Sequence, residues 1–238
     1  MLTTQLNTLF FRYKFSFNDK TIKSMEIIVS KDDLSIVEPK PKFFPEWAKL
    51  KEFKCPHCPL DVNKNEFCPL ALNLQDILKE FGTRQSFETV EVFVETPHRN
   101  YYKLTSLQQG VSSLLGILMV TSGCPVLGKL KPLLYFHLPF ASVNETEVRA
   151  LSLYLLSQYI KSLRGEEPDW EMKKLQKLYD DIRILNYHVS QKIVTLIEKD
   201  ASINSLIILN NFAEFVTIIL SEKALEEVEF YLKEFLNL

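Results

Sequence analysis

Every cysteine in this chain of 238 residues is followed by proline. The four dipeptides are Cys55-Pro56, Cys58-Pro59, Cys68-Pro69 and Cys124-Pro125. Proline pushes the residue before it out of the helical region toward extended geometry, which restricts the direction of that residue's side chain. A restricted direction suits a sulfur atom that binds a metal, so the sequence predicts a metal or cluster site formed by these four cysteines.

The spacing of the cysteines is typical of a tetrahedral metal centre. Cys55 and Cys58 have the two-residue spacing with which two thiolates chelate one ion. Cys68 follows after a short loop, and Cys124 is remote in the sequence. Four thiolates complete a zinc site, but Cys-Pro at each ligand also occurs around iron–sulfur clusters. We therefore expect structural zinc as the cofactor, with an iron–sulfur cluster as the alternative.

Other interpretations of the cysteines stay open. Pro59 stands where a rubredoxin-type knuckle usually has glycine, so the resemblance to that knuckle is partial. His57 is an alternative fourth ligand to Cys124. Free cysteines are also often small buried side chains in protein cores. A redox-active pair is a further alternative, although Pro59 and Asp61 do not resemble the first turn of the helix that follows a thioredoxin-type pair.

A second group of residues with chemical potential lies in the middle of the chain. The candidate pocket residues are Arg99, Gln108, His137, Glu145 and Arg149. An arginine, a histidine and a glutamate that converge near the Cys124 thiolate would bind an anion or perform acid–base chemistry. Each also has a structural interpretation, because Glu145 and Arg149 have the spacing of a helical ion pair and His137 lies between two apolar residues.

A stripe of small and polar residues follows one face of an otherwise apolar segment. Its members recur three or four positions apart: Thr105, Gln108, Ser112, Gly116 and Met119. One interpretation is close helix packing at Gly116, with hydroxyls bonded to the preceding turn. The other is a polar wall of a buried pocket.

The period of the apolar residues divides the chain into two parts. The first part alternates between apolar and polar residues, which is typical of strands. The expected elements are strands over 11–17, 22–29, 34–37, 87–95 and 101–104 and a helix over 70–81. From Thr105 onward the period is close to 3.6, which predicts helices. We therefore expect a single α+β unit, with a small antiparallel sheet and a cysteine loop in 1–104 and a helical bundle in 105–238.

Local signals predict where the later helices begin and end. Ser142 and Glu145 form a capping box, which starts a helix that stops at Gly165. Pro168 and Asp169 open the next helix, which is expected to continue to residue 197.

The end of the chain is expected to bury apolar helices. The segment 202–220 is apolar on nearly all sides, so its neighbours or another subunit must cover it. The last helix should place one face on the core, formed by Leu225, Val228, Leu232 and Phe235. These features leave a homo-oligomeric scaffold as one hypothesis.

The composition argues against several classes of protein. The chain has 28 basic and 30 acidic residues, a net charge of -2 and no block of like charge, so we expect no nucleic-acid partner. No apolar stretch is long enough to span a membrane. The first residues do not resemble a signal peptide, which together with the Cys-x-x-Cys pair predicts a cytoplasmic protein. No Walker loop, nucleophile elbow, H-E-x-x-H or dinucleotide fingerprint is present.

Five short blocks of sequence stand out. They are Cys55-Pro-His-Cys-Pro-Leu, Phe67-Cys-Pro-Leu-Ala-Leu-Asn-Leu, Ser106-Leu-Gln-Gln-Gly, Thr121-Ser-Gly-Cys-Pro, and His137-Leu-Pro-Phe-Ala-Ser with Glu145-Thr146. Together they resemble an uncharacterised bacterial protein family to which no activity is assigned. The resemblance implies a bacterial cytosolic origin and one coherent unit, and it transfers no mechanism.

These observations favour a cytosolic metal-binding protein with a structural zinc site and a binding or regulatory role for the helical half. The expected partner is a small anion or another protein. The alternatives are an enzyme with a site between Cys124, His137 and the Glu145/Arg149 helix, and an iron–sulfur redox protein. Whether the protein is an enzyme stays open at this point.

Overall fold

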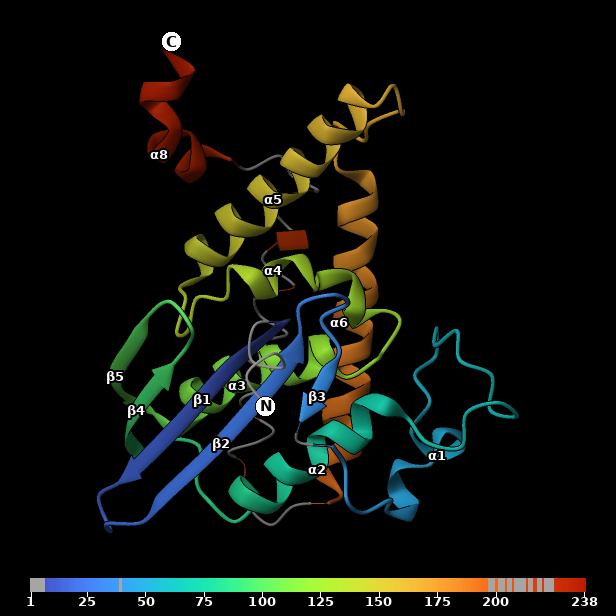
Figure 1. The fold of residues 1–238 in the computed structure, drawn as a ribbon, viewed down its shortest axis with the longest axis vertical. Helices are drawn as coiled ribbons and strands as arrows, with labels where there is room; N and C mark the ends of the chain where they lie inside the picture. Colours follow the sequence, from blue (N-terminus) through green and yellow to red (C-terminus); the bar gives the residue numbers. More distant parts are fainter. Residues whose placement is uncertain are drawn as a thin grey trace.

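The computed structural model describes residues 7–38, 40–196 and 225–238, together with residues 200, 204, 207, 213, 216, 217 and 220. Within these residues a five-stranded antiparallel sheet is followed by a mainly helical half (Figure 1). The α+β fold class expected from the sequence is thus confirmed.

The sheet has the strand order β3-β2-β1-β4-β5. Its strands are β1 (Thr8–Phe17), β2 (Ile22–Ser30), β3 (Ile36–Glu38), β4 (Thr89–Glu95) and β5 (Asn100–Ser106). In the central strand β1 every second side chain is buried, as the alternating pattern predicts. The third strand begins two residues later than expected, because Leu34 closes a turn in which its N–H donates to the Ser30 carbonyl at 3.0 Å.

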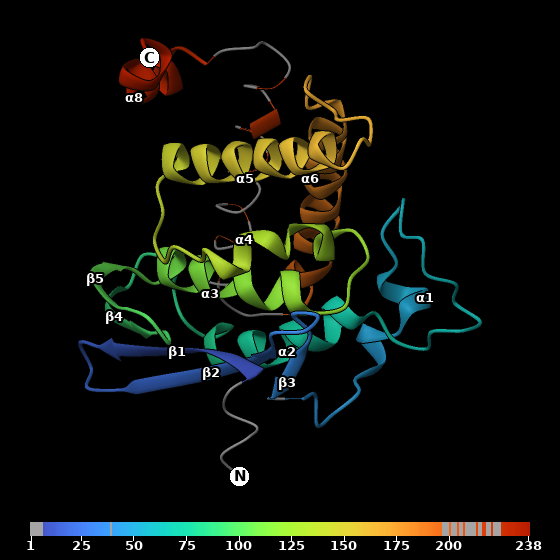
Figure 2. The same ribbon diagram turned by 45° about the horizontal axis from the view of Figure 1, so that its top comes forward.

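The helices form layers on one face of this sheet. They are α1 (Leu50–Phe53), α2 (Pro69–Phe81), α3 (Leu107–Thr121), α4 (Pro132–Tyr135), α5 (Val143–Leu163), α6 (Lys173–Val194) and α8 (Glu226–Leu236), with the 3-10 turns η2 (Glu46–Ala48) and η3 (Leu127–Leu130). In Figure 2, α2 and α3 lie directly against the sheet, α4 and α5 lie beyond α3, and α6 crosses these layers at one side. The layer between α3 and α5 is therefore enclosed by helices on several sides.

Helix α3 approaches the sheet most closely at Gly110. A Cβ atom on Gly110 would lie 2.9 Å from Phe15 Cε1 and 2.9 Å from Val92 Cγ2, and both of these side chains are fully buried. A Cβ atom on Gly116, in contrast, would have no neighbour within 4 Å among the described residues. Within this part of the chain, the contact of α3 that requires glycine lies at Gly110, almost two turns before Gly116, where the sequence suggested close packing.

The ends of α5 agree with the sequence signals. The Ser142 hydroxyl accepts from the Glu145 N–H at 3.2 Å, and the Glu145 carboxylate accepts from the Ser142 N–H at 2.7 Å. Beyond the C-terminus of α5, Gly165 has a φ of +73°, a conformation that glycine adopts readily. Helix α6 begins later than expected, because the Asp169 carboxylate accepts from the N–H groups of Lys173 and Lys174 and so caps the helix from outside it.

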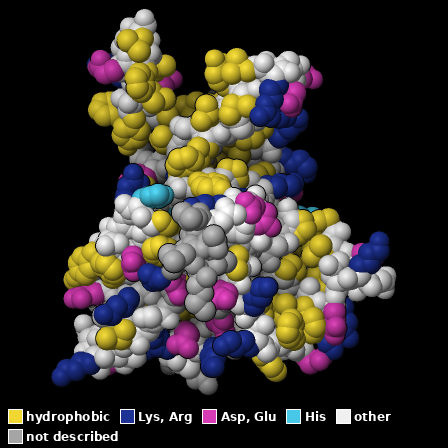
Figure 3. Space-filling view, in the orientation of Figure 1, with side chains coloured by type: hydrophobic (Ala, Val, Ile, Leu, Met, Phe, Trp, Pro, Cys, Tyr) yellow, Lys and Arg dark blue, Asp and Glu magenta, His cyan; other side chains and the backbone are white. Residues whose placement is uncertain are grey.

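The last helix does not pack as the sequence predicts. Val228 is buried, but Phe235 is 76% exposed, so the expected core face of α8 is wrong over its C-terminal part. Apolar side chains gather on the surface over α5 and α8 (Figure 3). Most of the expected helix over 202–220 lies outside the described residues. Among the helices of the described part, none is long and apolar enough to cross a membrane.

Candidate functional site

A loop that carries three of the cysteines is closed at its base by backbone hydrogen bonds. The Leu50 N–H donates to the Glu66 carbonyl at 2.8 Å, and the Cys68 N–H donates to the Ala48 carbonyl at 2.8 Å. Within the loop, a turn brings the Cys58 N–H to the Cys55 carbonyl at 3.1 Å. These bonds hold both ends of the cysteine loop in place, so its backbone has a defined position relative to α2.

The fourth cysteine joins this loop through contact between two helix ends. Cys68 is the N-cap residue of α2, and Cys124 follows the C-terminus of α3. Between Cys124 and α3, Gly123 has a φ of +89°, and a Cβ atom there would lie 3.7 Å from Pro69 Cβ. The end of α3 thus lies against the start of α2, which places Cys124 beside the cysteine loop.

Burial favours the protonated thiol at Cys55, Cys68 and Cys124. Burial, followed by the nearness of the other three cysteines, raises the pKa of the Cys55 thiol to about 12. Burial also raises the pKa of Cys68, to about 11, and that of Cys124.

Backbone N–H groups oppose this effect at two of the sulfurs. The N–H groups of Leu70 and Ala71 favour the Cys68 thiolate, although they do not form a full capping hydrogen bond with it. The N–H groups of Val126 and Leu127 favour the Cys124 thiolate. Local dipoles at two helix or turn starts are thus directed at sulfur, as they are in many sites where thiolates bind a metal.

The structure brings the four predicted metal ligands into one cluster. All four are free cysteines, and Cys55, Cys68 and Cys124 are buried in the same part of the core. In this conformation, however, no group of three or more His, Cys, Asp or Glu side chains of the described residues is arranged to hold a metal ion. A tetrahedral site would require the thiols to turn toward a common point and to lose their protons.

Two histidines, His57 in the cysteine loop and His188 on α6, lie near each other. Both ring nitrogens of His57 and the Nε2 atom of His188 are buried without a hydrogen-bond partner. Burial lowers the pKa of His188, and the nearby Lys192 and His57 lower it further. His188 on α6 therefore lies near the cysteine loop.

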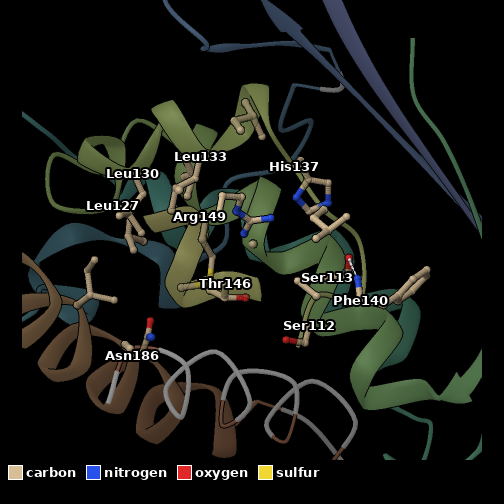
Figure 4. A pocket seen from close by; sticks show the side chains of 18 of the residues that line it. Ser112, Ser113, Leu127, Leu130, Leu133, His137, Phe140, Thr146, Arg149 and Asn186 are labelled. Atoms are coloured by element: carbon tan, nitrogen blue, oxygen red, sulfur yellow. Dashed lines mark hydrogen bonds between the residues drawn. The ribbon is translucent and has the colours of Figure 1, made fainter. Parts of the chain in front are cut away.

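A cavity of about 190 Å³ lies between α3, α4, α5 and α6 (Figure 4). Its walls are mostly apolar, with Leu127, Leu130 and Leu133 on one side. Three members of the small polar stripe of α3 line it, namely Ser112, Gly116 and Met119. The interpretation of this stripe as a pocket wall is consistent with the geometry of these three residues.

Arg149 extends from α5 into this cavity. Its Nη1 group donates to the Phe136 carbonyl at 3.3 Å, and its Nε group is buried without a partner. Burial lowers the pKa of Arg149, although Tyr179, Glu145 and Tyr101 partly offset this effect. No Asp or Glu side chain of the described part of the chain lies within ion-pair distance of this guanidinium.

A hydrogen-bond network holds His137 between the sheet and the cavity. Tyr13 on β1 places its hydroxyl 2.8 Å from His137 Nε2 and 2.8 Å from Ser113 Oγ. Protein surrounds the imidazole, and this burial, followed by the charge of Arg149, lowers the pKa of His137 to about 3. His137 is therefore a neutral, oriented hydrogen-bonding residue at the cavity wall.

A second, more open cavity of about 780 Å³ adjoins the first. The two cavities share His137 and Arg149 as lining residues. Arg99 and Glu145 line the second cavity, so four of the five predicted pocket residues are brought together. Gln108 lines neither cavity, whereas the next residue, Gln109, lines the first. The backbone N–H of Gln108 donates to the Ser86 carbonyl at the start of α3.

The predicted convergence of Cys124 with the pocket residues does not occur. Cys124 lies with the other cysteines, and no cysteine of the described residues lines either cavity. The signal that sequence reasoning missed is Asn186 on α6, which lines the first cavity. Asn186 is 3% exposed, and its Oδ1 atom is buried without a hydrogen-bond partner. The feature of the sequence that could have identified it is a polar residue on the apolar face of a helix.

The fold and these two sites define an α+β protein with a buried cysteine cluster and a separate helix-lined cavity. A family model described as a domain of unknown function (DUF6901) matches residues 11–233, and the chain belongs to this family. No curated protein and no solved structure matches the chain.

Proposed function

We propose that this protein binds a small molecule in its helical half and that zinc, held by Cys55, Cys58, Cys68 and Cys124, stabilises its fold. The observation that carries the metal proposal is the gathering of four free cysteines from distant parts of the chain into one cluster. A cytoplasmic location belongs to this proposal, since a reducing compartment keeps such cysteines available to a metal.

The position of the cysteine cluster supports a structural role for the ion. Cys55, Cys58 and Cys68 belong to the part of the chain between β3 and α2, whereas Cys124 follows α3. An ion bound by all four would join these segments and stabilise only the folded state, because the unfolded chain lacks the arranged ligands. Binding would also release the thiol protons, so zinc affinity would rise with pH.

The cavity supports the binding role. It combines apolar walls with a few polar groups and contains the buried Arg149 side chain. An enzyme that uses Cys124 as a nucleophile has less support, since no cysteine lines the described cavity walls. An iron–sulfur cluster uses the same ligands as zinc, and elemental analysis distinguishes the two.

The metal proposal is tested on the full chain purified without oxygen and without a metal-binding tag. We expect about one zinc per chain by elemental analysis and no visible absorption. Addition of zinc to the metal-free wild type should raise its unfolding midpoint, and the same addition to Cys124→Ser should not. The matched control is Thr121→Ser, which keeps the buried hydroxyl that bonds to the Ile117 carbonyl at 2.8 Å and should retain the response to zinc.

Three results would contradict this proposal. Detection of iron and inorganic sulfide in place of zinc would show that the cysteines hold an iron–sulfur cluster. A protein without metal that does not respond to added zinc would leave the cysteines as buried apolar side chains. A Cys124→Ser variant that still gains stability from one zinc would remove Cys124 from the set of ligands.

A further inference from the structure

We infer that the cavity around Arg149 binds a small carboxylate with an apolar body and a hydrogen-bond donor at the opposite end. This inference rests on the proposed binding role of the helical half and is independent of the metal. It names the class of ligand from the charge, the volume and the unpartnered groups of the cavity.

The charged groups at the cavity favour an anion. Lys103 and Arg149 line the cavity, and no Asp or Glu is present among its described lining residues. Glu145, which lines the adjoining cavity, attracts both Arg149 and Lys103 through its charge, but its carboxylate accepts the Ser142 N–H of the capping box. The positive charge of the cavity is therefore only partly balanced, and no described carboxylate lies on its own wall.

The guanidinium of Arg149 has unused hydrogen-bonding capacity. Its long hydrogen bond to the Phe136 carbonyl uses Nη1, while Nε is buried without a partner. Arg149 is a partly buried cation that forms no ion pair with a described carboxylate, so a ligand that supplies a negative charge and acceptor atoms stabilises this arrangement. A carboxylate matches the planar guanidinium through two parallel hydrogen bonds.

The opposite wall specifies a donor. Asn186 on α6 directs its side chain toward the cavity from the side away from α4 (Figure 4), and its buried Oδ1 atom is unpartnered. An amide oxygen accepts hydrogen bonds, so the unmet requirement is for a hydroxyl or amine hydrogen. The ligand would thus connect a cation at one end with an acceptor at the other.

The volume and the walls limit the body of the ligand. A cavity of about 150 Å³ lined by apolar side chains takes up benzene, and this cavity measures about 190 Å³. Leucines at positions 127, 130 and 133, together with Ile182, provide an apolar wall. A molecule of the size of 4-hydroxybenzoate combines the required carboxylate, apolar ring and hydroxyl.

The experiment is calorimetric titration of the full chain, as purified, with three matched probes. The probes are benzoate, its neutral analogue benzamide, and 4-hydroxybenzoate. We expect benzoate to bind at least tenfold more tightly than benzamide, and 4-hydroxybenzoate to bind more tightly than benzoate. Inorganic phosphate should bind much more weakly than benzoate, because it cannot fill the apolar part of the cavity.

Variants separate the charge from the cavity. Arg149→Met should abolish the preference for benzoate over benzamide, whereas Arg183→Met, a control on the exposed face of α6, should leave it unchanged. Gly116→Leu fills the cavity without removing charge and should weaken binding of all three probes. Circular dichroism and thermal unfolding verify that each variant is folded.

The possible failures are distinguishable. Equal binding of benzoate and benzamide, or an unchanged preference in Arg149→Met, would overturn the carboxylate site while leaving a binding role for the cavity. Asn186→Leu should weaken the binding of 4-hydroxybenzoate more than that of benzoate. If this variant bound both probes as tightly as the wild type does, the donor assignment would be wrong. Absence of binding by every probe would overturn both this inference and the proposed binding role, and the zinc measurement would stand separately.

Discussion

The same substitution at two glycines of α3 should have opposite effects on stability. Gly110→Ala places a methyl group 2.9 Å from Phe15 Cε1 and from Val92 Cγ2, and both neighbours are fully buried between helix and sheet. Gly116→Ala places the same methyl group where no atom of the described residues lies within 4 Å. The pair therefore compares overlap and free space within one helix.

The magnitude follows from two contributions. Replacing glycine by alanine in a helix interior stabilises the folded state by about 1 kcal/mol, and this contribution is similar at both positions. Overpacking in a dense core costs about 1–3 kcal/mol, and only Gly110→Ala carries this cost. We expect Gly116→Ala to raise the free energy of unfolding by up to about 1 kcal/mol. The free energy of unfolding of Gly116→Ala should be about 1–3 kcal/mol higher than that of Gly110→Ala.

Urea unfolding followed by circular dichroism measures this difference. Both variants should have the same dependence of the free energy on urea concentration as the wild type, so that midpoints report stability alone. Equal midpoints for the two variants would refute the packing argument. A Gly110→Ala variant more stable than Gly116→Ala would show that the sheet does not approach α3 at Gly110.

Two further predictions concern the network around His137. The pKa of His137 is about 3 in the folded state instead of its usual 6.5. Between these two pH values the unfolded chain binds a proton that the folded chain does not bind. The contribution of His137 to the free energy of unfolding is therefore fully present above pH 6.5, and it falls by about 1.4 kcal/mol per pH unit as the pH decreases toward 3. The difference between the wild type and His137→Gln in urea unfolding at several pH values measures it, and an identical pH dependence would contradict the assigned burial. Tyr13→Phe removes the hydroxyl bonded to Ser113 and His137 and should cost about 1–3 kcal/mol; thermal unfolding checks this, and an unchanged midpoint would mean that the network contributes nothing to stability.

Most of the secondary structure could be predicted from local sequence patterns. The alternation in β1 and the capping box of α5 each involve neighbours in the chain, and both are present in the structure. The late start of α6 was missed because Asp169, outside the helix, caps it through Lys173 and Lys174. The C-terminal part of α8 was wrong because an apolar face is buried only where a partner element covers it, and Phe235 has none among the described residues.

The sequence allowed a prediction of which residues could form sites, but not of how all of them are grouped. The Cys-Pro pattern singled out the four cysteines as candidate ligands, because residue type and backbone restriction are properties of the sequence. Asn186 was missed and Gln108 was misplaced, because a helical period shows which residues share a face but not what that face contacts.

The sequence by itself determined the strand and helix pattern and the residue types available for metal and anion binding, since these depend on local geometry and side-chain chemistry. Only the tertiary structure decided which distant residues meet. The end of α3 packs against the start of α2, so Cys124 joins the cysteine cluster. Helix α5 packs on α4 instead, so Arg149 and His137 share a cavity of which Cys124 is not a lining residue. These groupings result from packing between elements remote in the chain, which local patterns do not specify.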